Sequence, residues 1–74
     1  MKKEIKRLQE QYKDIIEREI VLQIEKSDPY DNRSPRCYKI FAYLKNGNLI
    51  CEYGYCKNKE NIIKKFEERL IKGE

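Results

Sequence analysis

Apolar residues recur with helical spacing in two stretches of the chain. From Lys2 to Arg18 they repeat at intervals of three and four, at Ile5, Leu8, Tyr12, Ile15 and Ile16. A second stretch has the same pattern at Ile62, Ile63, Phe66, Leu70 and Ile71. One apolar stripe on an otherwise charged helix is typical of a helix that packs on a core. We therefore predict helices over about residues 2–18 and 59–72, the second with Asn58 as its N-cap and Gly73 at its end.

Between these stretches the apolar residues alternate, as they do in a strand with one buried face. Ile20, Leu22 and Ile24 fall on one face of a strand predicted over about residues 19–26. Two further β-rich runs, 37–45 and 48–56, flank Asn46-Gly47, a dipeptide that favours the two-residue type I′ turn of a β-hairpin. The stretch 27–36 holds both prolines and several turn-forming residues, so it is predicted to be a mobile loop.

A two-residue turn also predicts the register of the hairpin, with Lys45 opposite Asn48. This register places one set of side chains on the face toward the helices: Tyr38, Ile40, Ala42, Leu44, Leu49, Cys51, Tyr53 and Tyr55. The other face then carries Phe41, Tyr43 and Ile50 beside polar residues. These three are the candidate protein-contact patch, with scattered surface apolar residues as the equally weighted alternative.

The predicted elements form an α+β fold in the order α-β-β-β-α. Three antiparallel strands with one apolar face need a cover, which both helices supply by packing on the same face. At 74 residues, 1–74 is predicted to be a single binding domain. Because so small a core supplies little stability, a homodimer is also considered.

The chain is basic, and its positive charges gather in two places. Lys and Arg number 17 against 13 Asp and Glu, a net charge of +4, which suits an acidic partner or serves solubility alone. The candidate nucleic-acid-binding residues are Arg33 and Arg36 in the predicted loop and Lys57, Lys59, Lys64 and Lys65 at the start of the second helix. A helix N-terminus favours anions, although a solvated mixed-charge helix also explains these lysines.

Groups for catalysis or metal binding are sparse. The chain has no histidine, so a serine or cysteine nucleophile would lack its usual base. The chain has three cysteines, Cys37, Cys51 and Cys56. Three are too few for a four-ligand zinc site, and an odd number does not suit a framework of disulfide pairs. Cys37 and Cys56 are predicted to lie opposite one another, in a pair whose side chains are too far apart to favour a disulfide. We expect free thiols, no catalysis, no metal and no cofactor.

The apolar runs are also shorter than the roughly 18 residues of a membrane span, and no signal peptide is predicted. A reducing cytoplasm, with no membrane partner, is the expected location.

The segment SPRCYKIFAYLKNGNLICEYGYCKNKE, within an α-β-β-β-α chain, resembles the double-stranded-RNA-binding domain over most of the sequence. In that family the first helix and the loop between the first two strands enter minor grooves of an RNA duplex. Lysines that open the last helix hold phosphates across the major groove. The resemblance implies that Arg33, Arg36, Lys57, Lys59 and the outer face of the first helix contact RNA.

The ending KENIIKKFEERLIKG, together with the small size, high charge and order of elements, is similar to some phage-encoded anti-CRISPR proteins. This resemblance implies a stoichiometric blocker that grips a host protein or a protein–RNA complex. We therefore expect a non-catalytic inhibitor of a host defence nucleoprotein complex. The alternative is a module that binds double-stranded or otherwise structured RNA.

Overall fold

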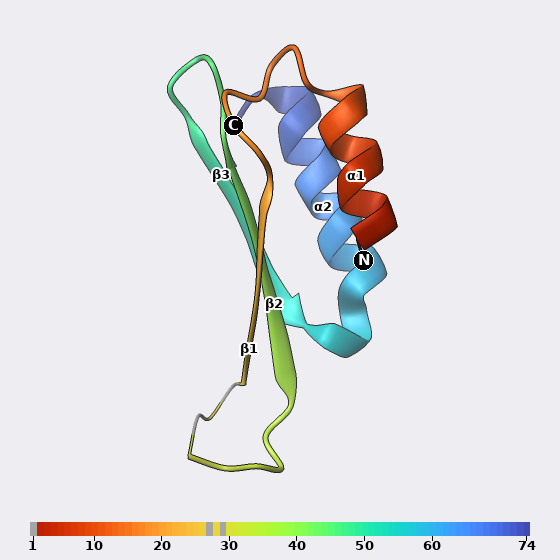
Figure 1. Ribbon diagram of the computed structural model, residues 1–74, viewed down its shortest axis with the longest axis vertical. Coiled ribbons are helices and arrows are strands. Elements are labelled where there is room, and N and C mark those ends of the chain that lie inside the picture. The colour runs from red at the N-terminus through yellow and green to blue at the C-terminus, as the bar shows by residue number, and fades with distance from the viewer. Residues whose placement is uncertain (1, 27, 29) are drawn as a thin grey trace.

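The computed structural model describes residues 2–26, 28 and 30–74 as a layer of helices on a layer of strands. The elements are α1 (Lys2–Gln11), β1 (Val21–Lys26), β2 (Arg36–Tyr43), β3 (Leu49–Tyr55), the 3-10 turn η1 (Cys56–Asn58) and α2 (Lys59–Lys72). The strands form an antiparallel sheet in the order β1-β2-β3, and both helices lie on one face of it (Figure 1). The predicted α+β class and element order are confirmed. Met1 and the predicted loop residues Ser27 and Pro29 lie outside the described residues.

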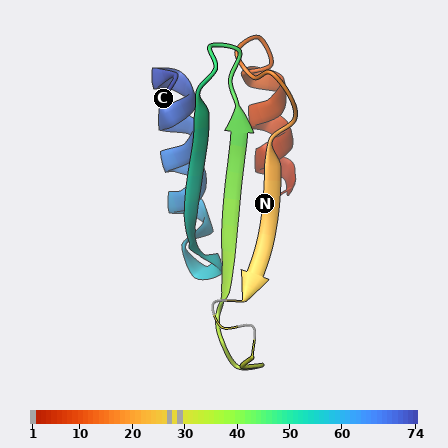
Figure 2. The ribbon, with the colours of Figure 1, turned by 90° about the vertical axis from the view of Figure 1, so that its left-hand side faces the viewer.

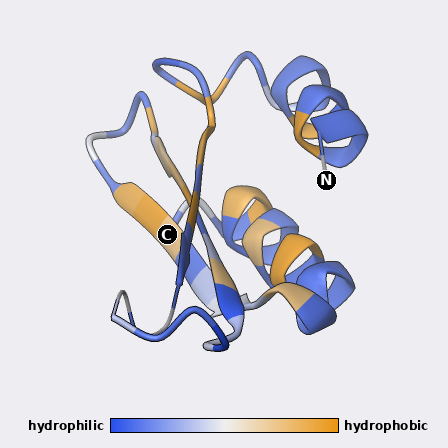
Figure 3. Ribbon diagram, turned by 60° about the horizontal axis from the view of Figure 1, so that its bottom comes forward, coloured by the Kyte–Doolittle hydropathy of each residue, from blue (hydrophilic) through white to orange (hydrophobic). Residues whose placement is uncertain are grey.

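The core fills the space between the sheet and the helices. Its most deeply buried side chains, each with 2% or less of its surface exposed, are Leu8, Ile40, Ala42, Leu44, Ile50, Phe66 and Leu70. Hydrophobic positions concentrate on the strands and on α2, whereas α1 is mostly hydrophilic (Figure 3). Burial of this apolar set is the main force that holds the two layers together.

The first helix is shorter than the predicted 2–18. It ends at Gln11, and the Tyr12 carbonyl then accepts hydrogen bonds from the Ile15 and Ile16 amides at 3.0 and 3.1 Å. Ile16 forms an isolated antiparallel bridge with Leu44 and is buried. The apolar pair at Ile15 and Ile16 therefore marks a contact with the hairpin and not another turn of helix.

A polar cluster at Glu67 ties α1 to α2. The Arg7 guanidinium lies 3.2 Å from one Glu67 oxygen, and the Tyr12 hydroxyl donates to the other at 2.9 Å. These hydrogen bonds, that of Arg7 first, lower the pKa of Glu67, so the carboxylate stays charged where it is partly buried. The cluster fixes the two helices side by side.

The second helix has the predicted bounds and the predicted ends. Gly73 adopts φ +77°, the left-handed conformation that ends many helices at a glycine. Asn58 occupies the N-cap position, but its side chain makes no capping hydrogen bond. The Gly73 carbonyl accepts hydrogen bonds from the side-chain amides of Asn46 and Asn48, at 3.0 and 2.8 Å. The tip of the hairpin is thereby held to the end of α2.

The hairpin turn contains three residues, and the predicted type I′ turn is wrong. The Gly47 amide donates to the Leu44 carbonyl at 3.0 Å, and the Leu44 amide donates to the Asn48 carbonyl at 2.8 Å. Gly47 has φ +92°, whereas no residue other than glycine has a positive φ among those that the structure describes. A turn followed by a left-handed glycine is the common three-residue hairpin loop.

The extra loop residue shifts β3 by one position from the predicted register. Ala42 lies opposite Ile50, Ile40 opposite Glu52 and Tyr38 opposite Gly54. Because strand side chains alternate, this shift moves every β3 side chain to the other face. Ile50 therefore lies in the core and is wrong as a protein-contact residue. The β3 residues that are predicted to face the helices lie on the opposite face of the sheet instead, namely Leu49, Cys51, Tyr53 and Tyr55.

Neighbouring residues of β3 offer a direct test of this register. We expect Ile50→Ala to lower the free energy of unfolding by about 2–5 kcal/mol, because Ile50 is fully buried. Leu49→Ala, at a residue with 53% of its surface exposed, is expected to cost about 0.5 kcal/mol or less. Urea denaturation followed by circular dichroism measures both.

If Ile50→Ala does not fold, Ile50→Val provides the milder comparison, with an expected cost of about 0.5–1.5 kcal/mol. A larger loss for the Leu49 variant than for the Ile50 variant would contradict the observed register.

Candidate functional site

The face of the sheet that points away from the helices has no element over it in the part of the chain that the structure describes (Figure 2). The register arranges its side chains in three rows across the strands and one pair beside the turn. The rows are Val21–Phe41–Cys51, Gln23–Lys39–Tyr53 and Glu25–Cys37–Tyr55, and the pair is Tyr43–Leu49. We call these residues the outer sheet face.

Aromatic rings dominate the outer sheet face. Tyr43, Tyr53 and Tyr55 have 49%, 61% and 46% of their surface exposed, and Phe41 is half-buried among them. The Phe41 and Tyr43 rings meet edge to face with centroids 6.5 Å apart. Val21 and Leu49 extend the apolar surface to both sides. An exposed patch of this composition indicates a surface that contacts another molecule.

Two lysines lie next to these rings. The Lys39 ammonium is 5.8 Å from the centre of the Phe41 ring, and the Lys57 ammonium is 6.0 Å from that of Tyr55. At such distances a cation is attracted to the ring face. Among the strand residues, all of which the structure describes, Glu25 is the one carboxylate on this face, because Glu52 faces α2 and pairs with Arg69 at 2.6 Å. The aromatic surface therefore carries local positive charge.

Cys37 lies on this face opposite Tyr55 but is buried, with 2% of the residue exposed. Its hydrogen bond with the Tyr53 hydroxyl raises the pKa of Tyr53. The predicted register places Cys37 opposite Cys56, but in the structure Cys37 lies opposite Tyr55. Cys56 lies in η1 near Tyr38, whose pKa is raised by burial first and then by this thiol. All three cysteines are free.

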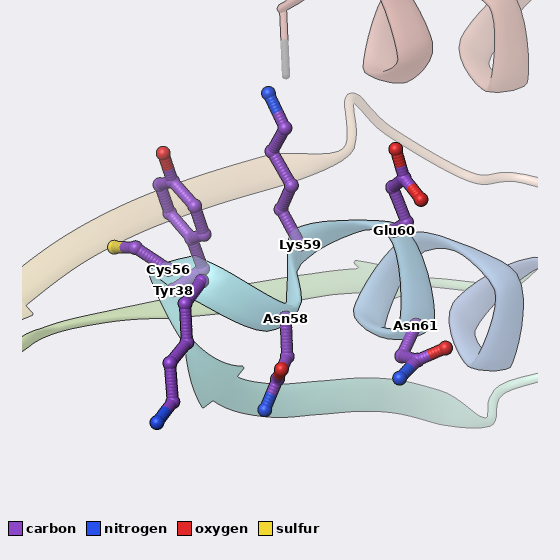
Figure 4. Close-up of a pocket in the computed structure, with 7 residues that line it drawn as sticks. Tyr38, Cys56, Asn58, Lys59, Glu60 and Asn61 are labelled. Carbon is purple, nitrogen blue, oxygen red and sulfur yellow. The ribbon is translucent and has the colours of Figure 1, made fainter.

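A second candidate site is a cavity of about 510 Å³ at the start of α2, lined by Tyr38 and residues 56–61 (Figure 4). Lys59 and Glu60 point toward α1, whereas Asn58 points toward β3 (Figure 4). Lys57 and Lys59 are both exposed and both line the cavity. Lys64 and Lys65 are exposed farther along α2, outside the cavity lining. Two of the four predicted lysines thus line one cavity, but their ammonium groups lie on different sides: that of Lys57 lies over the Tyr55 ring, and Lys59 points toward α1 (Figure 4).

The two predicted arginines are both exposed. The segments that carry them, the β1–β2 connection and the start of β2, lie at the same end of the molecule as the start of α2 (Figure 1). Arg33 lies in the connection between β1 and β2, where its amide donates to the Asp31 carboxylate at 2.9 Å. Arg36 is not in the loop as predicted, because it is the first residue of β2 and pairs with Lys26. That pairing sets two like charges opposite one another at the end of the sheet.

Of the predicted protein-contact residues, Phe41 and Tyr43 lie on the outer sheet face and Ile50 does not. The sequence pattern does not predict Leu49, Tyr53 and Tyr55 as contact residues, yet all three are exposed on this face. One signal could have found them: Glu52 and Gly54 alternate with Ile50 on the same face of the strand. A glutamate opposite an arginine of α2 and a glycine under a helix both suit an inward face.

Within residues 2–26, 28 and 30–74, no group of three or more Cys, Asp or Glu side chains is placed to hold a metal ion. No helix in the same residues is long and apolar enough to cross a membrane.

The contact between Tyr53 and the buried Cys37 thiol can be tested with a thiol reagent. In a Cys51→Ser/Cys56→Ser background, we expect Cys37 to react slowly in the folded protein, because it is buried. Adding Tyr53→Ala is expected to make it react rapidly, whereas Tyr30→Ala, at a tyrosine of the β1–β2 loop, is expected to change nothing. An unchanged rate in the Tyr53 variant would mean that other side chains cover the thiol.

Comparison with protein-family models, with curated proteins and with solved structures found no match. The resemblances to double-stranded-RNA-binding domains and to anti-CRISPR proteins are therefore supported only by the order of elements, which the chain does have.

Proposed function

We propose that this chain is a non-catalytic binding protein that inhibits a host defence nucleoprotein complex, as anti-CRISPR proteins do, through its outer sheet face. The supporting observation is the exposure of Tyr43, Tyr53 and Tyr55 around Phe41 on one uncovered face. Tyrosine and other aromatic residues are enriched in interface cores and in binding hot spots. Large rings with few rotatable bonds also lose little entropy when a partner orders them.

Size and composition suit stoichiometric binding. A stable interface needs about 800 Å² from each partner. One broad face of a molecule with 5703 Å² of total surface is of that order. The chain has no histidine, so general acid–base chemistry would need other groups. Inhibition by occupying a surface requires only affinity.

A phage assay tests this function. Expression of the chain is expected to restore plaquing of a targeted phage in at least one bacterium from a panel that covers the CRISPR system types. The double variant Tyr43→Ser/Tyr53→Ser is expected to lower the efficiency of plaquing at least about tenfold, because each hot-spot ring contributes more than about 1 kcal/mol. Tyr30→Ser is the matched control, since Tyr30 is 97% exposed and lies off the sheet.

Immunoblotting and circular dichroism establish that the variants accumulate and fold like the parent chain. Failure to restore plaquing in every system would contradict the proposed function. So would restoration that survives loss of both rings.

The second candidate function is binding of double-stranded RNA at the basic end of the molecule. The favouring observation is that Lys57 and Lys59 share one cavity lining at the start of α2. The β1–β2 connection, with Arg33, and the start of β2, with Arg36, lie at the same end of the molecule (Figure 1). Backbone phosphates of a duplex suit such a group of exposed cations. This site uses the end of the sheet and not its outer face.

Charge reversal separates this candidate from the first. Lys59→Glu and Arg33→Glu are expected to weaken binding to an RNA duplex and to reduce the dependence of log K on log salt by about 1 for each lost phosphate contact. Lys13→Glu, beyond the other end of α1, is the control. Fluorescence anisotropy at several salt concentrations measures the affinities. Duplex binding that both reversals leave intact would contradict this site.

A further inference from the structure

We infer that the outer sheet face binds single-stranded nucleic acid, with bases stacked on Tyr53, Tyr55 and Tyr43 and phosphates held by Lys39 and Lys57. This inference rests on the proposed function, because both use the same face, and it names which component of a nucleoprotein complex the face would contact. It differs from the double-stranded-RNA candidate in ligand and in site, although Lys57 borders both sites.

The arrangement of the rings suits unpaired bases. Tyr53 and Tyr55 are two residues apart on β3, so they lie on the same face about 7 Å apart along the strand. Tyr43 extends the aromatic surface along β2 toward the turn. Successive exposed rings on a sheet allow successive bases of a splayed strand to stack without regard to sequence. The bases of a duplex are already stacked on one another and could not use these rings.

The position of the lysines favours nucleic acid over a protein or a second copy of the chain. Lys39 lies in the middle of the central strand, between Gln23 and Tyr53, and next to Phe41. The cores of protein interfaces are depleted in lysine, because its ammonium is costly to bury. In a dimer joined through this face the two copies would each bring a Lys39 to the centre. A phosphate, in contrast, pairs with the ammonium and stays partly solvated.

Charge complementarity extends to the edge of the face. Lys57 lies over Tyr55, so a base stacked on that ring would carry its phosphate past the ammonium. Glu52, which could repel a phosphate, is turned to the other side of the sheet and paired with Arg69. Glu25 is the carboxylate that remains, at one corner of the sheet beside Cys37. The central and β3 parts of the face therefore favour an anionic chain.

Anisotropy of labelled oligonucleotides tests the inference. The probes are oligouridine and oligodeoxythymidine, each about ten nucleotides long to match a site of roughly 4–16 nucleotides, and an RNA duplex. We expect saturable binding of at least one single strand. With two phosphate contacts the slope of log K against log salt is expected to be about −1.4 between roughly 50 and 200 mM.

Two kinds of variant separate stacking from charge. Tyr53→Leu is expected to weaken binding roughly 5- to 100-fold and to leave the salt slope unchanged, because it removes a ring and no charge. Lys39→Met keeps the apolar stem and is expected to reduce the slope by about 0.7. Tyr30→Leu is the control with unchanged affinity. Circular dichroism checks that each variant folds, and the exposure of Tyr53 and Lys39 makes loss of folding unexpected.

Three results would overturn the inference. The first is no saturable binding of either single strand at low salt, and the second is binding that Tyr53→Leu does not weaken. The third is tighter binding of the duplex that Lys59→Glu abolishes and Tyr53→Leu does not, which would support the double-stranded-RNA candidate instead.

The outcome is separable from that of the phage assay. If the ring variants lose inhibition and no single strand binds, the proposed function stands and the face contacts protein. If a single strand binds and no CRISPR system is inhibited, the face binds nucleic acid in another role.

Discussion

The register of the hairpin depends on the backbone conformation of Gly47. Its φ of +92° lets the chain pass through a three-residue loop, with Leu44 closing the ladder against Asn48. Other residues adopt that conformation only at a cost of about 1–2 kcal/mol. The face on which each β3 side chain lies depends on this loop, since a loop shorter by one residue would turn Ile50 outward and the tyrosines inward. The hydrogen bonds from Asn46 and Asn48 to Gly73 hold this loop against the last helix.

Elements with strong periodicity were predictable from the sequence. Residues 59–72 form a helix with the expected bounds because four apolar side chains recur on one face and a glycine follows. The end of α1 was not predictable in this way. Ile15 and Ile16 continue the helical spacing, but Ile16 forms a bridge to Leu44 instead and is buried. Tertiary contacts outweigh helix propensity at such positions.

The candidate site was half predictable for a similar reason. Phe41 and Tyr43 lie on β2, whose faces are set by its pairing with β1, and both were assigned to the outer face correctly. On β3 the register of the predicted two-residue turn places Leu49, Cys51, Tyr53 and Tyr55 inward, and the apolar character of this set agrees with that placement. The structure exposes this set and places Ile50, Glu52 and Gly54 against the helices. A strand whose exposed face is more aromatic than its buried face is typical of a functional surface. Hydrophobicity alone assigns the two faces of such a strand wrongly.

The strands keep the residues that hold the layers together apart from those that meet the outside. One side of the sheet packs against the helices through Ile40, Ala42 and Ile50. The other side carries Lys39, Phe41 and Tyr53, which contribute little to the packing between the two layers. Substitutions at the exposed positions of the outer side are therefore expected to disturb the fold less than substitutions in the core. If the outer sheet face binds a target as proposed, a lineage could change that face while its scaffold stayed the same, and distant descendants would then share a core pattern and no visible binding motif.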